Sequence, residues 1–376
     1  MAGKTGADPE LSIAQHQWRE RGNKLRVLEG KAVDKASHQG VAASEYPEAA
    51  PLVRFTGNPI LRPIRDHPWE SKYVLNPGVI KLNGKIYLVY RAVGEDSISR
   101  LGLAVSEDGL VFNQRLETPI FGPKVKSEAM GCEDPRLTLI NDHIYMLYTA
   151  YDGFTPQIAM ASIPVDDFLS YRWGAWCRHG LVFPGTANKN AALFPELFNG
   201  KFTMLHRITP DIWIGFSPHL HCPWPGEEQT ILARSASGHA WEATKIGAGS
   251  PPLKTRYGWL LLTHGIGSDH VYRLGAMLLD LVDPTMVLYR SPNSILAPED
   301  SCETGQPGAS WVQNVVFTCG AAPFLDGEHM LDAESVILVY YGAADSVICV
   351  AQARVGDLIP IQYGESGAAG NYRTRG

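Results

Sequence analysis

The chain has 376 residues, of which 45% are apolar and 19% are charged. This apolar share is large enough to fill an extensive core, which excludes a mainly disordered chain. The net charge of -6 lacks the basic excess of nucleic-acid or membrane-surface binding proteins, so we expect neither partner. The 37 glycines and 26 prolines favour short strands joined by many turns.

Residues 1–50 precede the first strand-like segment and form an N-terminal extension. Residues 11–28 combine helix formers with many charges, which predicts a short helix ahead of a flexible, polar segment. A wholly disordered tail is the alternative, whereas a helix could mediate a homo-oligomer. The first ten residues lack the apolar segment of a secretory signal, and the six cysteines show no CxxC spacing. We therefore expect reduced thiols and a cytoplasmic location.

A repeated strand pattern fills residues 51–364, and residues 365–376 form a loose, glycine-containing tail. In each repeat a turn precedes an apolar run rich in β-forming residues, and the runs end at Arg91, Thr149, Arg207, His264 and Tyr341. The first four ends are about 58 residues apart, and the last gap is longer. Each run also follows a short strand that begins near Asn76, Asp134, Lys189-Asn190, Ser250 or Asn314. A third strand follows each run.

Five units of three or four strands predict an all-β fold, a five-bladed β-propeller with a short N-terminal extension. Two β-sandwiches with accidental periodicity are the alternative. In a propeller the innermost strands line a channel, and ligands bind at one of its mouths. The start of the first strand lies beside the end of the second in each hairpin, so the polar residues at these positions predict a ring of hydrogen-bond donors. A solvated rim position is the alternative for each residue alone.

Three basic members of this ring suggest an anion site. Lys189, Arg207 and His264 could together hold a dianion such as phosphate, because arginine offers a planar fork and lysine a point charge. The alternative is an exposed loop lysine and a buried core histidine. The chain has neither GxxxxGK[ST] nor a GxGxxG that opens a helix after a strand, which disfavours nucleotides, and it has no HExxH motif. We expect no cofactor and no metal.

Asp134 is the carboxylate best placed to act as an acid. It opens a strand in the segment 132–136, and Pro135 is expected to hold it in an extended conformation. Aspartate before proline is also a common turn former, and Glu133 could be the acid instead. Further carboxylates that could reach the same mouth are Asp345 and, as weaker candidates, Glu196 and Glu303.

Several ordered motifs carry a family resemblance. They occupy residues 76–78, 90–92, 133–136, 189–196, 205–207, 263–265, 272–280 and 340–345. Together they resemble glycoside hydrolase family 130, the inverting β-mannoside phosphorylases and related β-mannosidases, over about residues 55–360. The resemblance implies a five-bladed propeller that phosphorolyses terminal β-mannosides of manno-oligosaccharides and releases α-D-mannose 1-phosphate, with inorganic phosphate as co-substrate.

The resemblance also implies roles for individual residues. Asp134 matches the proton donor, which is thought to act through a sugar hydroxyl. The positions that match phosphate ligands are Lys189, Asn190, Arg207, His264 and Tyr272, although Lys189 stands where some members carry arginine. Those assigned to the mannosyl unit are Asn76, Arg91, Glu133 and Asp345.

Two other functions remain open from sequence. A β-mannoside hydrolase on the same scaffold would need a second carboxylate to activate water, such as Glu196 or Glu303. Phosphate is already an anionic nucleophile, so a phosphorylase does not need that base. A non-catalytic, carbohydrate-binding propeller is the other alternative. The linkage (β-1,2 or β-1,4), the acceptor sugar and the chain length depend on loops outside the ring.

Overall fold

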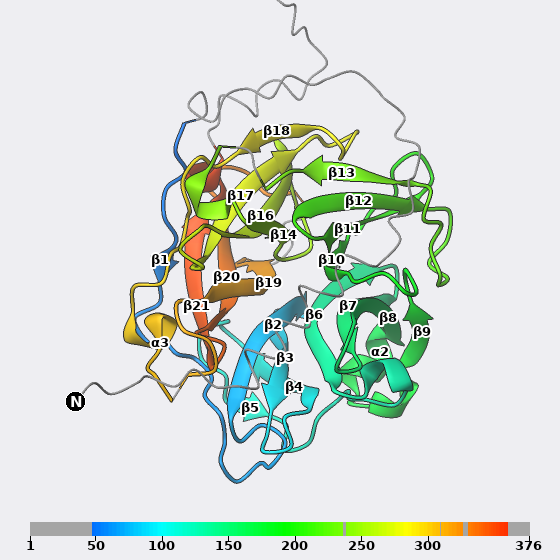
Figure 1. Ribbon diagram of the computed structural model, residues 1–376, viewed down its shortest axis with the longest axis vertical. Coiled ribbons are helices and arrows are strands. Elements are labelled where there is room, and N and C mark those ends of the chain that lie inside the picture. Colours follow the sequence, from blue (N-terminus) through cyan, green and yellow to red (C-terminus); the bar gives the residue numbers. More distant parts are fainter. Residues whose placement is uncertain (1–46, 236–237, 309, 326–329, 360–376) are drawn as a thin grey trace, which may run out of the picture. The chain divides into compact units, whose positions relative to one another are not determined.

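Short antiparallel strands make up nearly all of the regular structure (Figure 1). The computed structural model describes residues 47–235, 238–308, 310–325 and 330–359. The all-β class predicted from sequence is confirmed. The predicted N-terminal helix and the C-terminal tail lie outside the described residues.

The first two groups of strands share one eight-stranded sheet. Group 1 contains β2 (Tyr73–Leu82), β3 (Lys85–Val93), β4 (Ser99–Ser106) and β5 (Gln114–Arg115). Group 2 contains β6 (Gly131–Ile140), β7 (His143–Tyr151), β8 (Pro156–Pro164) and β9 (Cys177–Leu181). Neighbours within a group pair antiparallel, whereas the two groups meet through one parallel pairing of Ser99 with Gly131.

Three further groups form separate sheets. Group 3 contains β10 (Lys189–Leu193), β11 (Phe202–Ile208), β12 (Asp211–Ser217) and β13 (Gln229–Ala233). Group 4 contains β14 (Lys245–Ala248), β15 (Leu253–Thr255), β16 (Gly258–Ile266), β17 (Tyr272–Leu279) and β18 (Val287–Arg290). Group 5 contains β19 (Val316–Pro323), β20 (Val336–Ala343), β21 (Val347–Arg354) and, from the other end of the described chain, β1 (Val53–Arg54).

The helices in the described part of the chain are short. They are α2 (Val165–Leu169), α3 (Ser301–Thr304), α4 (Val355–Leu358) and the 3-10 turns η2 (Lys126–Glu128), η3 (Trp173–Ala175) and η4 (Ala240–Glu242). Among the described residues, no helix has the length and apolar character needed to cross a membrane.

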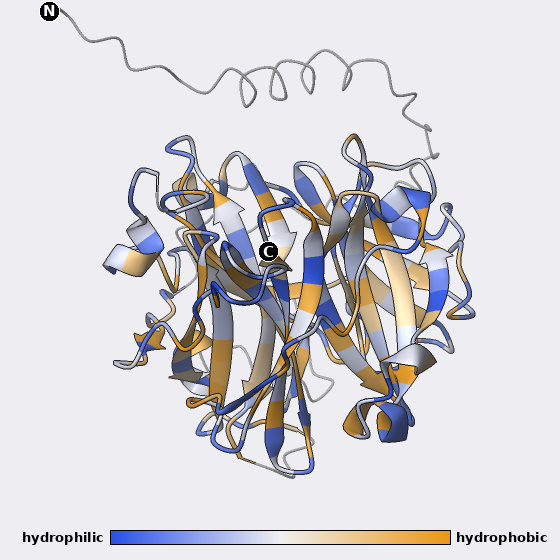
Figure 2. Cartoon of the chain, turned by 90° about the horizontal axis from the view of Figure 1, so that it is seen from below, coloured by the Kyte–Doolittle hydropathy of each residue, from blue (hydrophilic) through white to orange (hydrophobic). Residues whose placement is uncertain are grey.

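The first strands of the five groups approach one another. Strand β2 contacts β6 and β19, β6 contacts β10, and β10 contacts β14, whereas group 4 reaches β19 through its later strands β16 and β17. Figure 1 shows these strands near the centre of the described unit. Apolar residues spread along the strands in Figure 2, and among the described residues they form five large clusters and a small sixth one around Phe317. Each of the five large clusters joins two consecutive groups, and one of them joins group 5 to group 1.

Buried glutamates tie the outer strands to the inner ones in four of the groups. Each glutamate accepts a hydrogen bond from an arginine near the outer edge, in the pairs Glu70–Arg115, Glu128–Arg178, Glu242–Arg290 and Glu303–Arg54. Such buried pairs hold their partners in place, because removing one leaves an uncompensated charge.

Tyr341 belongs to one of these buried pairs, which corrects a prediction. Its hydroxyl donates to Glu303 at 2.7 Å, just as the Tyr90 hydroxyl donates to Glu70 at 2.8 Å. Tyr341 is therefore the counterpart of Tyr90, and Gly342 is the counterpart of Arg91. The prediction that Tyr341 joins the polar ring is wrong by one residue, which is enough to turn a strand side chain to the opposite face.

Candidate active site

Three equivalent β-bulges place polar residues at the same point of groups 1, 2 and 3. The pairings just before the bulges are Leu75 with Arg91, Glu133 with Thr149, and Lys189 with Arg207. The residues that follow have left-handed backbone, with φ of 47° at Asn76, 52° at Asp134 and 59° at Asn190. Asparagine and aspartate tolerate this conformation better than other residues with a Cβ.

The backbone of Asp134 differs from the extended conformation expected before Pro135. The bulge inserts an extra residue between the pairs formed by Glu133 and Arg136, and a left-handed residue absorbs the register shift. The usual preference of residues before proline is overridden by the pairing of β6 with β7. The same conformation recurs at Asn76, which also precedes a proline.

Asp134 is buried and hydrogen bonded, with 6% of its surface exposed. Its Oδ1 accepts hydrogen bonds from Asn76 Nδ2 at 2.9 Å and Arg91 Nη1 at 3.3 Å. Burial raises the pKa of Asp134, but Arg91, Lys189 and the Asn76 amide outweigh it and leave the pKa below its usual value. In the free protein Asp134 is therefore a carboxylate.

Glu133 connects two cations across the site. Its Oε1 accepts a hydrogen bond from Arg91 Nη2 at 2.8 Å, and its Oε2 accepts one from Lys189 Nζ at 3.1 Å. Arg91 also donates through Nε to Ser99 Oγ at 2.9 Å. The predicted sugar-binding Arg91 and the predicted phosphate-binding Lys189 are thus held by one buried carboxylate.

Asp345 reaches the same site from the turn between β20 and β21. Its φ is 48°, again left-handed. Burial raises the pKa of Asp345 to about 7, opposed by Arg91 and reinforced by Asp134. Two neighbouring carboxyl groups with pKa values displaced in opposite directions are a feature of acid–base sites.

Gly342 makes room for Asn76. A Cβ on Gly342 would lie 2.3 Å from Asn76 Oδ1 and 3.0 Å from its backbone nitrogen. The group 5 strand therefore has a glycine where the group 1 strand has Arg91, and this lets β2 and β20 come close together. Asn76 in turn orients the Asp134 carboxylate.

A second cluster forms where groups 3 and 4 meet. Arg207 Nη1 donates to His264 Nε2 at 3.2 Å, and both side chains are buried. Burial, and then Arg207, hold the pKa of His264 well below its usual value, so the ring is neutral and acts as the acceptor. A Cβ on Gly247 would lie 2.5 Å from the His264 ring and 3.3 Å from Arg207 Nη1, so only glycine lets the two side chains meet.

Lys245 belongs to this cluster but is absent from the residues predicted from sequence. Burial, with further contributions from Arg207 and Lys189, lowers the pKa of Lys245 to about 8. Its Nζ lies 5.3 Å from the centre of the Tyr272 ring, within cation–π range. Burial raises the pKa of Tyr272 to about 12, so its hydroxyl keeps its proton at neutral pH.

The sequence signal for Lys245 was obscured by a break in the first strand of group 4. The prolines at 251 and 252 mark β15, whereas the segment equivalent to the start of the other first strands is β14, which begins at Lys245. Ser250 lies between these two strands. In β14, Lys245 stands two residues before Gly247, the residue paired with His264. Both residues therefore lie on one face of the strand.

The cations of this cluster lack counter-charges. Within the described ranges, no carboxylate lies at ion-pair distance from Arg207 or Lys245, and Arg207 Nε has no hydrogen-bond partner. Buried cations are costly unless an anion or hydrogen-bond acceptors accompany them. This arrangement favours the binding of an anion beside the Asp134 carboxylate.

Comparison with known proteins agrees with this geometry. The family profile described as beta-1,4-mannooligosaccharide phosphorylase matches residues 52–363. The chain belongs to glycoside hydrolase family 130. A 1,2-beta-oligomannan phosphorylase and a beta-1,2-mannobiose phosphorylase, both from Thermoanaerobacter sp. (strain X514), are 39% and 38% identical, over 82% and 80% of this chain and 98% and 96% of theirs.

A solved structure of the family has a similar fold. The beta-1,2-mannobiose phosphorylase from Listeria innocua, in complex with beta-1,2-mannobiose, superimposes with a TM-score of 0.70 at 26% identity. The match covers 84% of this chain and 99% of that one.

The carboxylates that a hydrolase of family 130 could use as a base are engaged elsewhere. Glu196 accepts hydrogen bonds from Lys254 Nζ at 2.6 and 2.7 Å on the exposed surface. Glu303 is bound to Arg54 and Tyr341. Neither is hydrogen bonded to a residue of the site, so the structure gives no support to the predicted water-activating role of either residue.

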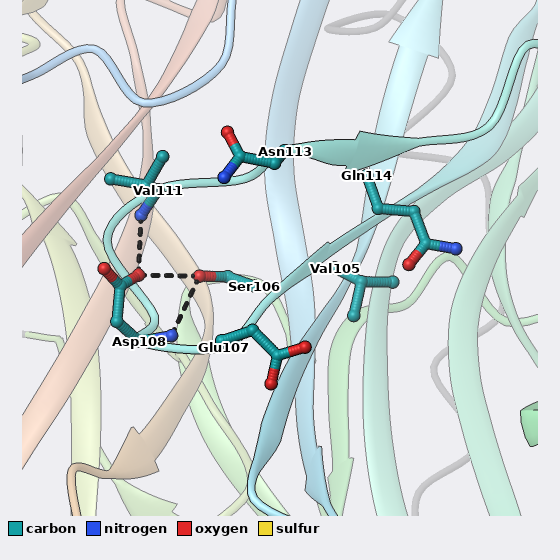
Figure 3. A pocket seen from close by; sticks show the side chains of 7 residues that line it. All are labelled: Val105, Ser106, Glu107, Asp108, Val111, Asn113 and Gln114. Carbon is teal, nitrogen blue, oxygen red and sulfur yellow. Dashed lines mark hydrogen bonds between the residues drawn. The ribbon is translucent and has the colours of Figure 1, made fainter.

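A hollow at the β4–β5 turn is a separate feature (Figure 3). Asp108 is the carboxylate at its edge, and it accepts hydrogen bonds from the Ser106 hydroxyl and the Val111 amide, each at 2.9 Å. These bonds shape the turn and use the carboxylate locally. Within the ranges that the structure describes, no group of three or more His, Cys, Asp or Glu residues is arranged to hold a metal.

Proposed function

We propose that this family 130 protein catalyses the inverting phosphorolysis of terminal β-mannosides in manno-oligosaccharides and releases α-D-mannose 1-phosphate. The observation that carries the proposal is a pair of cations without carboxylate partners, the buried Arg207 and the half-buried Lys245. Inorganic phosphate supplies the missing negative charge and serves as the nucleophile. The phosphorylase relatives at 38–39% identity support the same conclusion.

The cation cluster binds and orients phosphate. Arg207, Lys245 and Lys189 neutralise its charge, and the Asn190 amide, His264 and Tyr272 add hydrogen-bonding groups. Phosphate held in this way attacks the anomeric carbon, and the cations stabilise the negative charge beside the oxocarbenium-like transition state. No second carboxylate is needed to activate a water molecule.

The neighbouring polar groups bind the mannosyl unit and assist the leaving sugar. In this proposal Asn76, Arg91, Glu133 and Asp345 bind the mannosyl unit, and Asp134 supplies the proton to the leaving oxygen. The pKa of Asp134 is lowered in the free protein mainly by Arg91 and Lys189, against the effect of burial. Bound phosphate offsets these cations and the sugar excludes water, and both changes raise the pKa. Asp134 therefore becomes an effective acid in the ternary complex.

We infer that the five strand groups are the blades of a five-bladed β-propeller. The support is the circular order of contacts among the five groups, together with the apolar clusters that join consecutive groups, including group 5 to group 1. Strand β1, which completes group 5 from the N-terminal side of the described chain, is the usual way to close such a ring.

The six cysteines are all unpaired, which favours a reducing cytoplasm.

Mannobiose cleavage is expected to require inorganic phosphate and to yield α-mannose 1-phosphate in equal amount to the released mannose. The measurement compares sugar release in phosphate-containing and phosphate-free buffer, with β-1,2- and β-1,4-mannobiose as substrates. The names of the 38–39% identical relatives favour the β-1,2 linkage. Equal cleavage without phosphate would indicate the hydrolase. An absence of cleavage in both buffers would indicate a carbohydrate-binding module.

The Michaelis constant for phosphate is expected to rise as the pH increases through about 8, the pKa to which burial lowers Lys245. Above that pH Lys245 loses its charge, while Tyr272 keeps its proton up to about 12 and His264 is neutral throughout. Bound phosphate favours charged Lys245, so the rise starts at the pKa of the free protein and levels off only at the higher pKa of the complex. Lys245→Arg keeps the charge and should flatten the profile; the same rise in this variant would assign the titration to another group.

A further inference from the structure

Trp311 lies at the edge of the active site, in the segment that leads into β19. Its ring stacks on Tyr73, with centroids 5.1 Å apart and planes at 16°. The guanidinium of Arg91 lies 5.0 Å from the centre of the same ring. The Trp311 backbone amide donates to Ser346 Oγ at 3.0 Å, next to Asp345. Trp311 therefore contacts or adjoins two of the residues assigned to the mannosyl unit.

Part of the Trp311 side chain is open to solvent. Tyr73 pairs with Val93 and Leu75 pairs with Arg91 in the β2–β3 hairpin. Side chains two residues apart on paired strands share a face of the sheet, so Tyr73 and Arg91 both reach the ring from the β2–β3 hairpin. With 42% of its surface exposed, Trp311 still has apolar surface open to solvent beside these contacts. An indole held in this way is a flat, apolar surface beside a polar site.

The position of the phosphate site indicates which sugar this surface meets. The phosphate ligands come from groups 3 and 4, whereas Trp311 rests on Tyr73 and Arg91 of group 1. In an inverting reaction the nucleophile and the leaving group occupy opposite sides of the anomeric carbon. Arg91 also donates to Asp134, the residue proposed to serve the leaving oxygen. The leaving sugar therefore extends from Asp134 toward Arg91 and Trp311.

We propose that Trp311 is the stacking platform for the leaving sugar, the residue on the reducing-end side of the cleaved bond. Its indole packs against the apolar C–H face of that sugar, while Arg91, which also contacts the indole, remains bound to Glu133 and Asp134. Trp311 is a specificity-determining residue in this role. It selects a pyranose as acceptor in the synthetic direction. This inference rests on the proposed function, because it needs a donor site and an acceptor site.

The synthetic reaction tests the platform directly. With α-mannose 1-phosphate as donor and mannose as acceptor, Trp311→Ala is expected to raise the KM for mannose about tenfold, equivalent to about 1.4 kcal/mol of binding free energy. The KM for α-mannose 1-phosphate should stay unchanged. Trp311→Phe keeps an aromatic face and should recover part of the acceptor affinity. A thermal unfolding scan of each variant verifies that it is folded.

Phe324→Ala is the matched control, because Phe324 is an exposed aromatic, 44% accessible, beyond the opposite end of β19. It should leave both KM values unchanged. An unchanged mannose KM in Trp311→Ala would overturn the platform, as would an increase confined to the donor KM, which would place Trp311 in the mannosyl subsite. Failure of the proposed function would appear differently, as a wild-type protein that forms no mannoside from α-mannose 1-phosphate.

Discussion

Asp134→Asn is expected to lower the turnover number for an unactivated β-mannoside by roughly 10²–10⁴-fold, the usual contribution of a general acid. The variant should fold, because an asparagine oxygen can still accept the hydrogen bonds that Asn76 and Arg91 donate to Asp134 Oδ1. Removing the buried negative charge also leaves Lys189 and Arg91 bound to Glu133, so neither becomes unpaired. The loss is therefore one of proton transfer.

The leaving group provides the control for this prediction. An aryl β-mannoside leaves with less need for protonation, so Asp134→Asn should recover part of its activity on that substrate. Steady-state phosphorolysis of mannobiose and of the aryl mannoside, with each variant's unfolding temperature, makes the comparison. Near wild-type turnover on mannobiose would reduce Asp134 to a turn residue and make Glu133 or Asp345 the acid to test.

Asp345 is the reason that this test matters. It has the raised pKa, about 7, mainly because it is buried, whereas Asp134 has the lowered one. In the free protein the proton therefore resides on Asp345 rather than on the proposed acid. Phosphate binding reverses part of that order by neutralising the cations around Asp134. The acid role of Asp134 thus depends on both substrates being present.

Repeat spacing was sufficient to predict the strand groups, because a constant interval between apolar runs reflects a constant structural unit. The interval also singled out Arg91, Arg207 and His264, which the structure places in the two polar clusters described above. It failed at Tyr341, because the predicted run ends one residue too early. That one-residue error selects a side chain that points into the core instead of one that points toward the site. An apolar run marks a strand more reliably than it marks which residue ends it.

Local rules also failed where pairing between strands determines the backbone. Asp134 is left-handed despite the proline after it, because the bulge in β6 requires it. The repeat pattern does not predict Lys245 as a site residue, because β14 precedes the prolines at 251 and 252 that resemble the start of the repeat. Contacts such as that between Arg207 and His264 join distant segments, and the absence of counter-charges around them is visible only in three dimensions.

Arg207→Met is expected to weaken phosphate binding by more than tenfold and, without phosphate, to stabilise the fold. A hydrogen bond to a charged group contributes about 1.5–3 kcal/mol, so losing one at the phosphate lowers affinity by at least that factor. In the free protein, however, burial lowers the pKa of Arg207, and the residue has no carboxylate partner among the described residues. Methionine fills much of the same space without the cost of burying a charge.

Calorimetric unfolding with and without phosphate distinguishes these two effects. Phosphate should raise the unfolding temperature of the wild type strongly and that of Arg207→Met weakly, because only ligand bound to the folded state stabilises it. Arg273→Met is the control, since Arg273 pairs with Asp269 on the surface at 2.6 Å and should leave the phosphate effect intact. Two results would contradict this prediction: Arg207→Met binding phosphate as tightly as the wild type, or unfolding at a lower temperature than the wild type in phosphate-free buffer. Either result would mean that the Arg207 charge is already compensated within the protein and does not need an anion.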